Sequence, residues 1–126
     1  MQQTMVPKRK FDLEERTTKF TQNVRSFIRR ITKKLTNTGD CKQLLRSSGS
    51  VGANYIEANE AMSKADFIAR IKICRKEAKE SAYWLQVLDL TFNLELESER
   101  KALMQEAREL TLIFAAILRK TQNAVR

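Results

Sequence analysis

The chain contains no histidine among its 126 residues. This absence excludes Ser-His and Cys-His nucleophile pairs, histidine-ligated zinc and the Glu-x-x-His pairs of di-iron helical bundles. Cysteine is scarce as well: Cys41 and Cys74 stand far apart, and we interpret each as a reduced core thiol rather than a ligand or half of a disulfide. We therefore expect no enzyme activity, no metal and no cofactor.

Helix-breaking residues are few, with 3 Gly and 1 Pro, which favours long helices over many short strands. Because 42% of the residues are hydrophobic, we expect a folded chain with a core of its own, and we interpret residues 1–126 as one domain with a basic tail over residues 1–10. No apolar run reaches the roughly 18–20 residues of a membrane span, and the N-terminus lacks the apolar core of a secretory signal. We expect a cytoplasmic protein that does not enter membranes.

Apolar residues recur at helical spacing in four segments. Asp12 with Glu15 is a plausible N-cap pair for the first helix, and residues 36–39 read as a turn before a second helix, capped by Asp40, that runs to Asn59. The apolar face of the first helix comprises Phe20, Val24, Phe27, Ile31 and Leu35.

The second half of the chain repeats the pattern. Ser63 with Asp66 predicts the start of a third helix, and Ser98 that of a fourth after a loop over residues 92–97. Their predicted core stripes comprise Phe67, Ile71, Cys74, Ala78, Leu85 and Leu88, then Leu103, Ala107, Leu110, Phe114 and Ile117. Four amphipathic helices with short connections predict an all-α, antiparallel up-down-up-down four-helix bundle.

The segment LLRSSGSVGANYIEANEAMSKADF, residues 44–67, holds two of the three glycines. A phosphate-binding loop would need a preceding strand and a Gly-Lys-Ser/Thr ending, and neither is present. In a helix the apolar stripe is Leu44, Val51 and Tyr55. Each glycine inside a helix costs roughly 0.5–1 kcal/mol relative to alanine, and close approach of a neighbouring helix would compensate. We predict close helix packing at Ser48, Gly49 and Gly52.

Residues 42–88 resemble the four-helix-bundle proteins related to the bacterial 23S rRNA intervening-sequence proteins. The resemblance depends on Ser50-Val51-Gly52-Ala53-Asn54, on Ser63-Lys64-x-Asp66-Phe67 and on Glu80-x-x-x-Trp84-Leu85. It implies an antiparallel bundle assembled as a homopentamer, and it brings no enzyme activity. Some members of this group are encoded inside insertions in the large ribosomal RNA, and a distant relative assists a reverse transcriptase. The resemblance therefore implies a link to RNA, but it transfers no functional residues.

The third and fourth helices carry more apolar surface than one core needs. A helix that is apolar nearly all round is buried on several sides, which favours a subunit interface. A wide core stripe with a few exposed apolar residues is the alternative. The predicted interface residues are Ile73, Trp84, Val87, Leu112, Ile113 and Ala116.

The net charge of +9 is concentrated in residues 1–39, which carry 10 basic and 3 acidic side chains. Basic stripes attract phosphate backbones through counterion release, so we expect the chain to bind RNA or DNA, or a nucleic-acid-handling protein. No stacking aromatic is expected on these faces, and Glu77 and Glu80 flank the second stripe as on an ordinary solvated helix. The alternative is an assembly or adaptor protein without a nucleic-acid ligand. The predicted nucleic-acid-binding residues are Arg25, Arg29, Arg30 and Lys33 on the first helix, and Lys72, Arg75, Lys76 and Lys79 on the third.

Glu57 and Glu60 share a helical face and are the candidate acid–base or divalent-ion pair. Without histidine, we favour solvation, capping or an ion pair with an arginine such as Arg46.

Overall fold

The computed structural model describes residues 9–31 and 33–124, with side chains from Leu13 onward. Within these residues the chain forms four α-helices and no strand, which confirms the all-α prediction. The helices are α1 (Arg9–Arg29), α2 (Leu35–Asn59), α3 (Lys64–Val87) and α4 (Leu94–Asn123).

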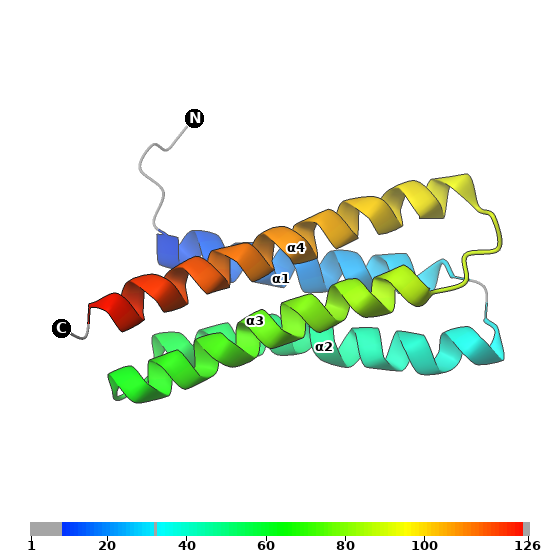
Figure 1. Ribbon diagram of the computed structural model, residues 1–126. Coiled ribbons are helices and arrows are strands. Elements are labelled where there is room, and N and C mark those ends of the chain that lie inside the picture. Colours follow the sequence, from blue (N-terminus) through cyan, green and yellow to red (C-terminus); the bar gives the residue numbers. More distant parts are fainter. Residues whose placement is uncertain (1–8, 32, 125–126) are drawn as a thin grey trace.

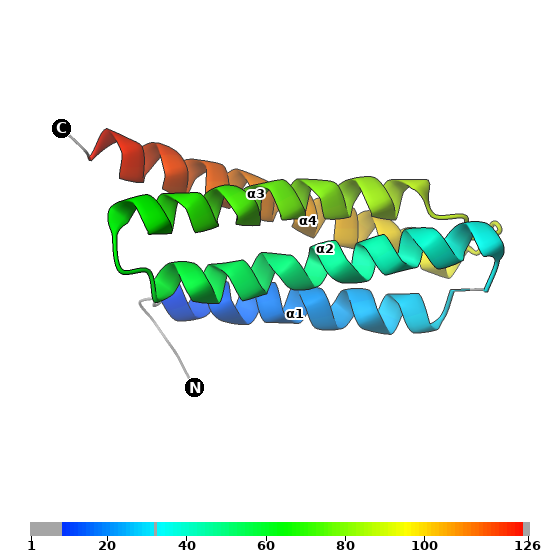
Figure 2. The ribbon, with the colours of Figure 1, turned by 90° about the horizontal axis from the view of Figure 1, so that it is seen from below.

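The four helices lie lengthwise beside one another (Figures 1 and 2). The α1–α2 and α3–α4 connections lie at one end of the molecule, and the α2–α3 connection lies at the other. Both α1 and α3 run beside α2 and α4, whereas the backbones of α1 and α3 are not neighbours within the described residues. The outer surfaces of α1 and α3 therefore face away from each other.

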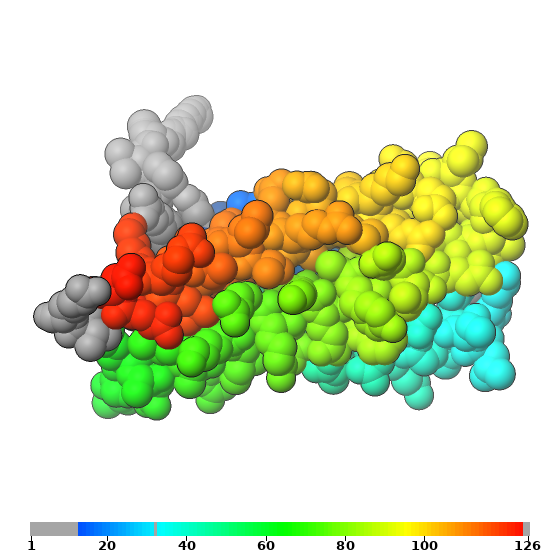
Figure 3. Space-filling view, viewed as in Figure 1, coloured from blue at the N-terminus to red at the C-terminus, as the bar shows by residue number. Residues whose placement is uncertain are grey.

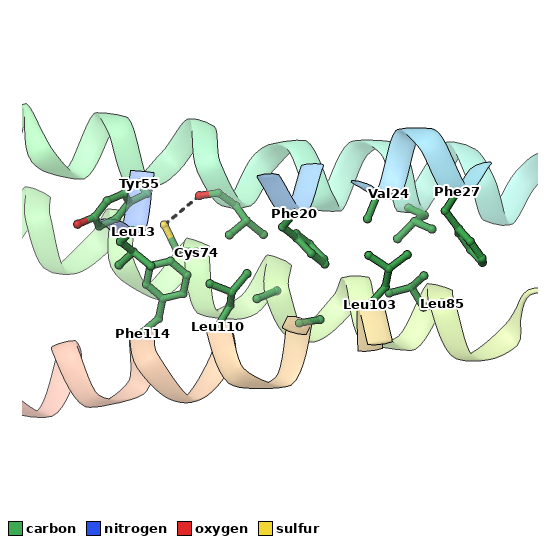
Figure 4. Close-up of a cluster of buried hydrophobic side chains, with 14 of the residues drawn as sticks. Leu13, Phe20, Val24, Phe27, Tyr55, Cys74, Leu85, Leu103, Leu110 and Phe114 are labelled. Carbon is green, nitrogen blue, oxygen red and sulfur yellow. Dashed lines mark hydrogen bonds between the residues drawn. The ribbon is translucent and has the colours of Figure 1, made fainter. Parts of the chain in front are cut away.

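Apolar side chains from all four helices meet along the centre of the molecule (Figure 4). The ring of Tyr55 lies 5.9 Å from that of Phe114, and the Cys74 thiol donates a hydrogen bond to the carbonyl oxygen of Val51 at 3.4 Å. Most residues of the predicted stripes are buried, but Phe67 and Ile117 are only partly buried and Leu35 is 91% exposed. Leu118 is buried in addition. The period of the apolar residues thus identified the core faces correctly.

The start of α3 is as predicted, but the start of α4 is not. The Ser63 hydroxyl accepts a hydrogen bond from the Asp66 amide at 3.0 Å, so Ser63 is the N-cap of α3. The corresponding bond at α4 runs from the Leu96 amide to the Asn93 side chain at 3.0 Å. Ser98 therefore lies inside α4, and the prediction that it caps this helix is wrong.

The predicted boundary between the first two helices is also wrong. Leu35 is the first residue of α2 and is 91% exposed, so it does not extend the apolar face of α1, and Asp40 lies inside the helix. Asn37, which reads as a turn former, is buried: its amide donates to the Asp89 carbonyl at 2.8 Å and accepts from the Asp89 backbone amide at 3.0 Å. This pairing holds residues 36–39 in a helix. At the other boundary, α1 already includes Arg9 and Lys10, so Asp12 lies within the helix and the rest of the basic tail lies outside the described residues.

The α3–α4 connection is held by Arg100. Its Nη1 donates to the carbonyl oxygens of Leu85, Gln86 and Leu88 at 3.1, 3.1 and 2.6 Å, and these carbonyls belong to the C-terminal end of α3. Carbonyls at a helix end lack intrahelical partners, so a residue of α4 completes the terminus of α3. The arginine also pairs with Glu97 at 2.6 Å.

Candidate nucleic-acid interface

The four predicted cations of α3 form a row on its exposed side. Lys72, Arg75, Lys76 and Lys79 are all exposed, and none of them forms a salt bridge with another described residue. Their spacing of three and four places them on one face of the helix, away from the core residues Ile71 and Ala78.

The four predicted cations of the first helix are arranged differently. Arg25 and Arg29 are exposed on α1, but Arg30 and Lys33 follow its last residue, so the prediction that Lys33 shares a helical face with Arg25 and Arg29 is wrong. Arg30 forms an ion pair with Glu99 of α4. Because α1 and α3 are not backbone neighbours, the two basic groups lie on separate faces of the molecule rather than on one surface.

Carboxylates on the α1/α4 and α2/α3 faces form salt bridges with cations there. On the α1/α4 face, Arg16 pairs with Glu106 and Glu109, each at 2.7 Å. On the α2/α3 face, Arg46 pairs with Glu77 at 3.1 Å and with Glu80.

Cations without such partners also gather on the α3/α4 face. Lys101 and Arg108 of α4 are exposed and form no salt bridge within the described part of the chain. They line a groove of about 500 Å³ between the two helices, which lie side by side in Figure 3. The residues lining the groove are Gln86, Glu97, Arg100, Lys101, Met104, Gln105 and Arg108. Sequence reasoning missed Lys101 and Arg108, because the groove forms only when α3 and α4 pack together.

An exposed aromatic residue also lies on the lysine side of α3, contrary to the sequence prediction. Tyr83 is 54% exposed and follows Lys79 by four residues, so it belongs to the lysine row. Its ring packs edge-on against Trp84, with centroids 4.9 Å apart. The spacing from Lys76 through Lys79 to Tyr83 is visible in the sequence and would have located it.

The two carboxylates that the sequence analysis singled out, Glu57 and Glu60, are both exposed, which agrees with the solvation alternative. Arg46 forms its salt bridges with Glu77 and Glu80 instead. Glu77 is only 5% exposed, which contradicts its interpretation as a solvated flanking residue.

Glu80 is also held in place rather than free in solvent. A hydrogen bond from the Trp84 indole, together with the Arg46 guanidinium, lowers the pKa of Glu80 below its usual value. Within residues 13–31 and 33–124, no three carboxylate or thiol side chains lie together as metal ligands.

The small residues of α2 lie against α1 to different degrees. A Cβ atom added to Gly52 would lie 3.2 Å from the Thr17 hydroxyl oxygen, whereas one added to Gly49 would meet only the end of Arg25, at 3.9 Å. Ser48 is buried, and its carbonyl oxygen accepts a hydrogen bond from the Thr21 hydroxyl at 3.0 Å.

The six residues predicted to form a subunit interface differ in exposure. Ile73, Trp84 and Ile113 are half-buried, and Trp84 and Ile113 pack against the core. Val87 is 42% exposed, Leu112 is 69% exposed, and Ala116 is exposed.

Among the helices of the described residues, none has an apolar stretch of the length that crossing a membrane requires.

Comparison with known proteins places this geometry in context. The family model of the 23S rRNA-intervening sequence protein matches residues 9–116. The fold is similar to that of a protein with unknown function from the S23 ribosomal protein family of Bacteroides thetaiotaomicron, with a TM-score of 0.75 and 28% sequence identity. The similarity covers 87% of this chain and 97% of that one. No curated protein matches the chain significantly.

Proposed function

The chain belongs to the 23S rRNA-intervening sequence protein family, and from this membership and its uncompensated cations we propose that it is a non-enzymatic RNA-binding protein. In this proposal it is an antiparallel four-helix bundle that assembles into a homo-oligomer, with five as the subunit number that the family resemblance implies. RNA, ribosomal RNA included, binds to its basic faces.

The observation that carries the proposal is the uncompensated charge of the α3/α4 face. The acidic residues of α4 that lie near α1 pair with Arg16 and Arg30, and those of α3 that lie near α2 pair with Arg46. The α3 row and the α4 cations have no such partners among the described residues. A phosphate backbone supplies anions at regular intervals, and an oligomer would repeat the cationic face in every subunit.

A non-enzymatic role is supported by the site chemistry. The chain has no histidine, Glu57 and Glu60 are exposed, and Glu77 and Glu80 pair with Arg46. The homo-oligomer is supported by the exposed apolar side chains of Val87 and Leu112. Native mass spectrometry tests the assembly, and a purely monomeric mass would remove that part of the proposal.

Filter binding to ribosomal RNA fragments tests the function. If 6–10 phosphates are contacted, affinity should fall by about 10³-fold or more between 50 and 200 mM salt. Two triple variants with equal loss of charge distinguish a specific face from net charge: Lys72→Gln with Lys76→Gln and Lys79→Gln, against Arg25→Gln with Arg29→Gln and Lys33→Gln. We expect the α3 triple to reduce the salt slope by roughly 2–3 and the other triple to reduce it less. Absence of salt-dependent binding by the unmodified protein would overturn the proposal.

The second candidate is an assembly or adaptor protein without a nucleic-acid ligand. The exposed apolar residues Val87 and Leu112 favour it, because they would suit a protein partner as well as a second copy of the chain. A specific protein that stays bound in a pull-down after nuclease treatment, with no RNA affinity, would identify this function.

A further inference from the structure

The row of cations on α3 does not end at Lys79. Tyr83 and Gln86 follow at spacings of four and three, so the row runs through Lys72, Lys76, Lys79, Tyr83 and Gln86. Residues at these spacings are neighbours on a helix surface. Because Gln86 also lines the α3/α4 groove, this row of side chains connects the lysines and the Tyr83 ring to the groove.

The position of Tyr83 suits an aromatic side chain that stacks on a nucleic-acid base. Just over half of the side chain is exposed, and its edge-on contact with the half-buried Trp84 restricts the ring. Trp84 is itself anchored, because its indole nitrogen donates to Glu80 at 3.0 Å. An aromatic ring held in this way and set between cations can stack on a base while its neighbours contact the adjacent phosphates.

The α3/α4 groove, which Gln86 lines one turn beyond Tyr83, offers both apolar and cationic groups to a nucleotide. Its volume is about 500 Å³, Met104 contributes apolar surface, and Lys101 and Arg108 are the cations available to an anion. Arg100 is not available to an anion, because it donates hydrogen bonds to the end of α3 and to Glu97. The Gln86 amide can both donate and accept hydrogen bonds, as the edge of a base requires.

We propose that the face formed by Tyr83 and the α3/α4 groove binds an unpaired nucleotide of single-stranded RNA. This inference rests on the proposed RNA binding and specifies its substrate. Tyr83 stacks on the base, Gln86 contacts the edge of the base, and Lys79 and Arg108 neutralise flanking phosphates. In a duplex the bases are stacked on one another and cannot reach the ring, so a duplex keeps only the electrostatic part of the interaction.

Equilibrium binding of one labelled RNA oligonucleotide, single-stranded or annealed to its complement, tests the inference. We expect Tyr83→Leu to weaken single-strand binding by about 5- to 100-fold and to leave the salt slope unchanged, because no charge is lost. Tyr83→Phe should retain the affinity. Lys79→Gln should instead reduce the slope by about 0.7, the contribution of one phosphate contact on a single strand. Phe92→Leu is the matched control, because Phe92 is 96% exposed and lies in the α3–α4 connection, outside the lysine row.

The possible results separate the two proposals. Salt-dependent binding that is equal for single strand and duplex, and unchanged in Tyr83→Leu, would overturn the unpaired-nucleotide site but leave RNA binding intact. Absence of salt-dependent binding to either RNA would overturn both. Because Tyr83 is outside the core, its variants should fold, and thermal melting checks this.

Discussion

Replacing Gly52 with leucine should separate α1 from α2. An added Cβ would lie 3.2 Å from the Thr17 hydroxyl oxygen and 3.5 Å from the Thr17 Cβ, and a leucine carries three further carbons beyond that point. Thr17 has little freedom to move, because it is 1% exposed and its hydroxyl donates to the Leu13 carbonyl at 2.9 Å. The extra atoms must therefore displace the helix itself.

Two opposing terms set the size of the effect. Overpacking of a close contact typically costs about 1–3 kcal/mol of unfolding free energy. Removal of a glycine from a helix interior recovers up to about 1 kcal/mol. We expect Gly52→Leu to lose about 1–2 kcal/mol, which lowers the melting temperature by roughly 3–6 °C per kcal/mol. Gly52→Ala needs only a small shift of Thr17 and should be close to neutral.

Gly39 provides the matched control, because it lies in the same helix and an added Cβ would meet no atom within 4 Å. Gly39→Leu should show the gain in helix propensity without the steric loss, so its melting temperature should rise. Thermal denaturation followed by circular dichroism measures both variants. If Gly52→Leu melts higher than the unmodified protein, as Gly39→Leu should, the reasoning that α1 approaches α2 closely at Gly52 is wrong.

Two further predictions concern Arg100 and Cys74. Arg100→Met leaves three carbonyls at the end of α3 without their donor and should lose roughly 1.5–3 kcal/mol in urea denaturation, the range for hydrogen bonds to a charged group, whereas exposed Lys101→Met should be nearly neutral. Burial raises the pKa of the Cys74 thiol to about 12, so its contribution to stability is complete below the unfolded pKa, near 9, and is lost as pH rises towards 12. Unfolding free energies measured from pH 8 to 11 should therefore fall more steeply for the unmodified protein than for Cys74→Ala, and equal slopes would contradict the shift.

The sequence predicted what depends on local periodicity. Phe20, Val24 and Phe27 follow the helical period and are buried, because an amphipathic helix must turn its apolar face inward wherever its partners lie. Ser63 was found for a similar reason, since a capping hydroxyl acts within one turn of its own helix.

The features that escaped prediction depend on distant parts of the chain. Asn37 is a residue type typical of turns, and its side chain is paired with the distant residue Asp89 inside α2. The groove cations Lys101 and Arg108 belong to a different helix from the lysine row, so no single stretch of sequence shows them together. Tyr83 is the exception, because its place in the lysine row could be predicted from residue spacing alone.

The pairing of Asn37 with Asp89 has a consequence for biosynthesis. The two residues are 52 positions apart, so Asn37 is synthesised well before Asp89 exists to bind its side chain. During that interval the first turn of α2 lacks its hydrogen bonds to Asp89, and we expect it to fray in the nascent chain. The α1–α2 connection then reaches its final structure only after α3 has emerged. This end of the molecule should therefore fold late.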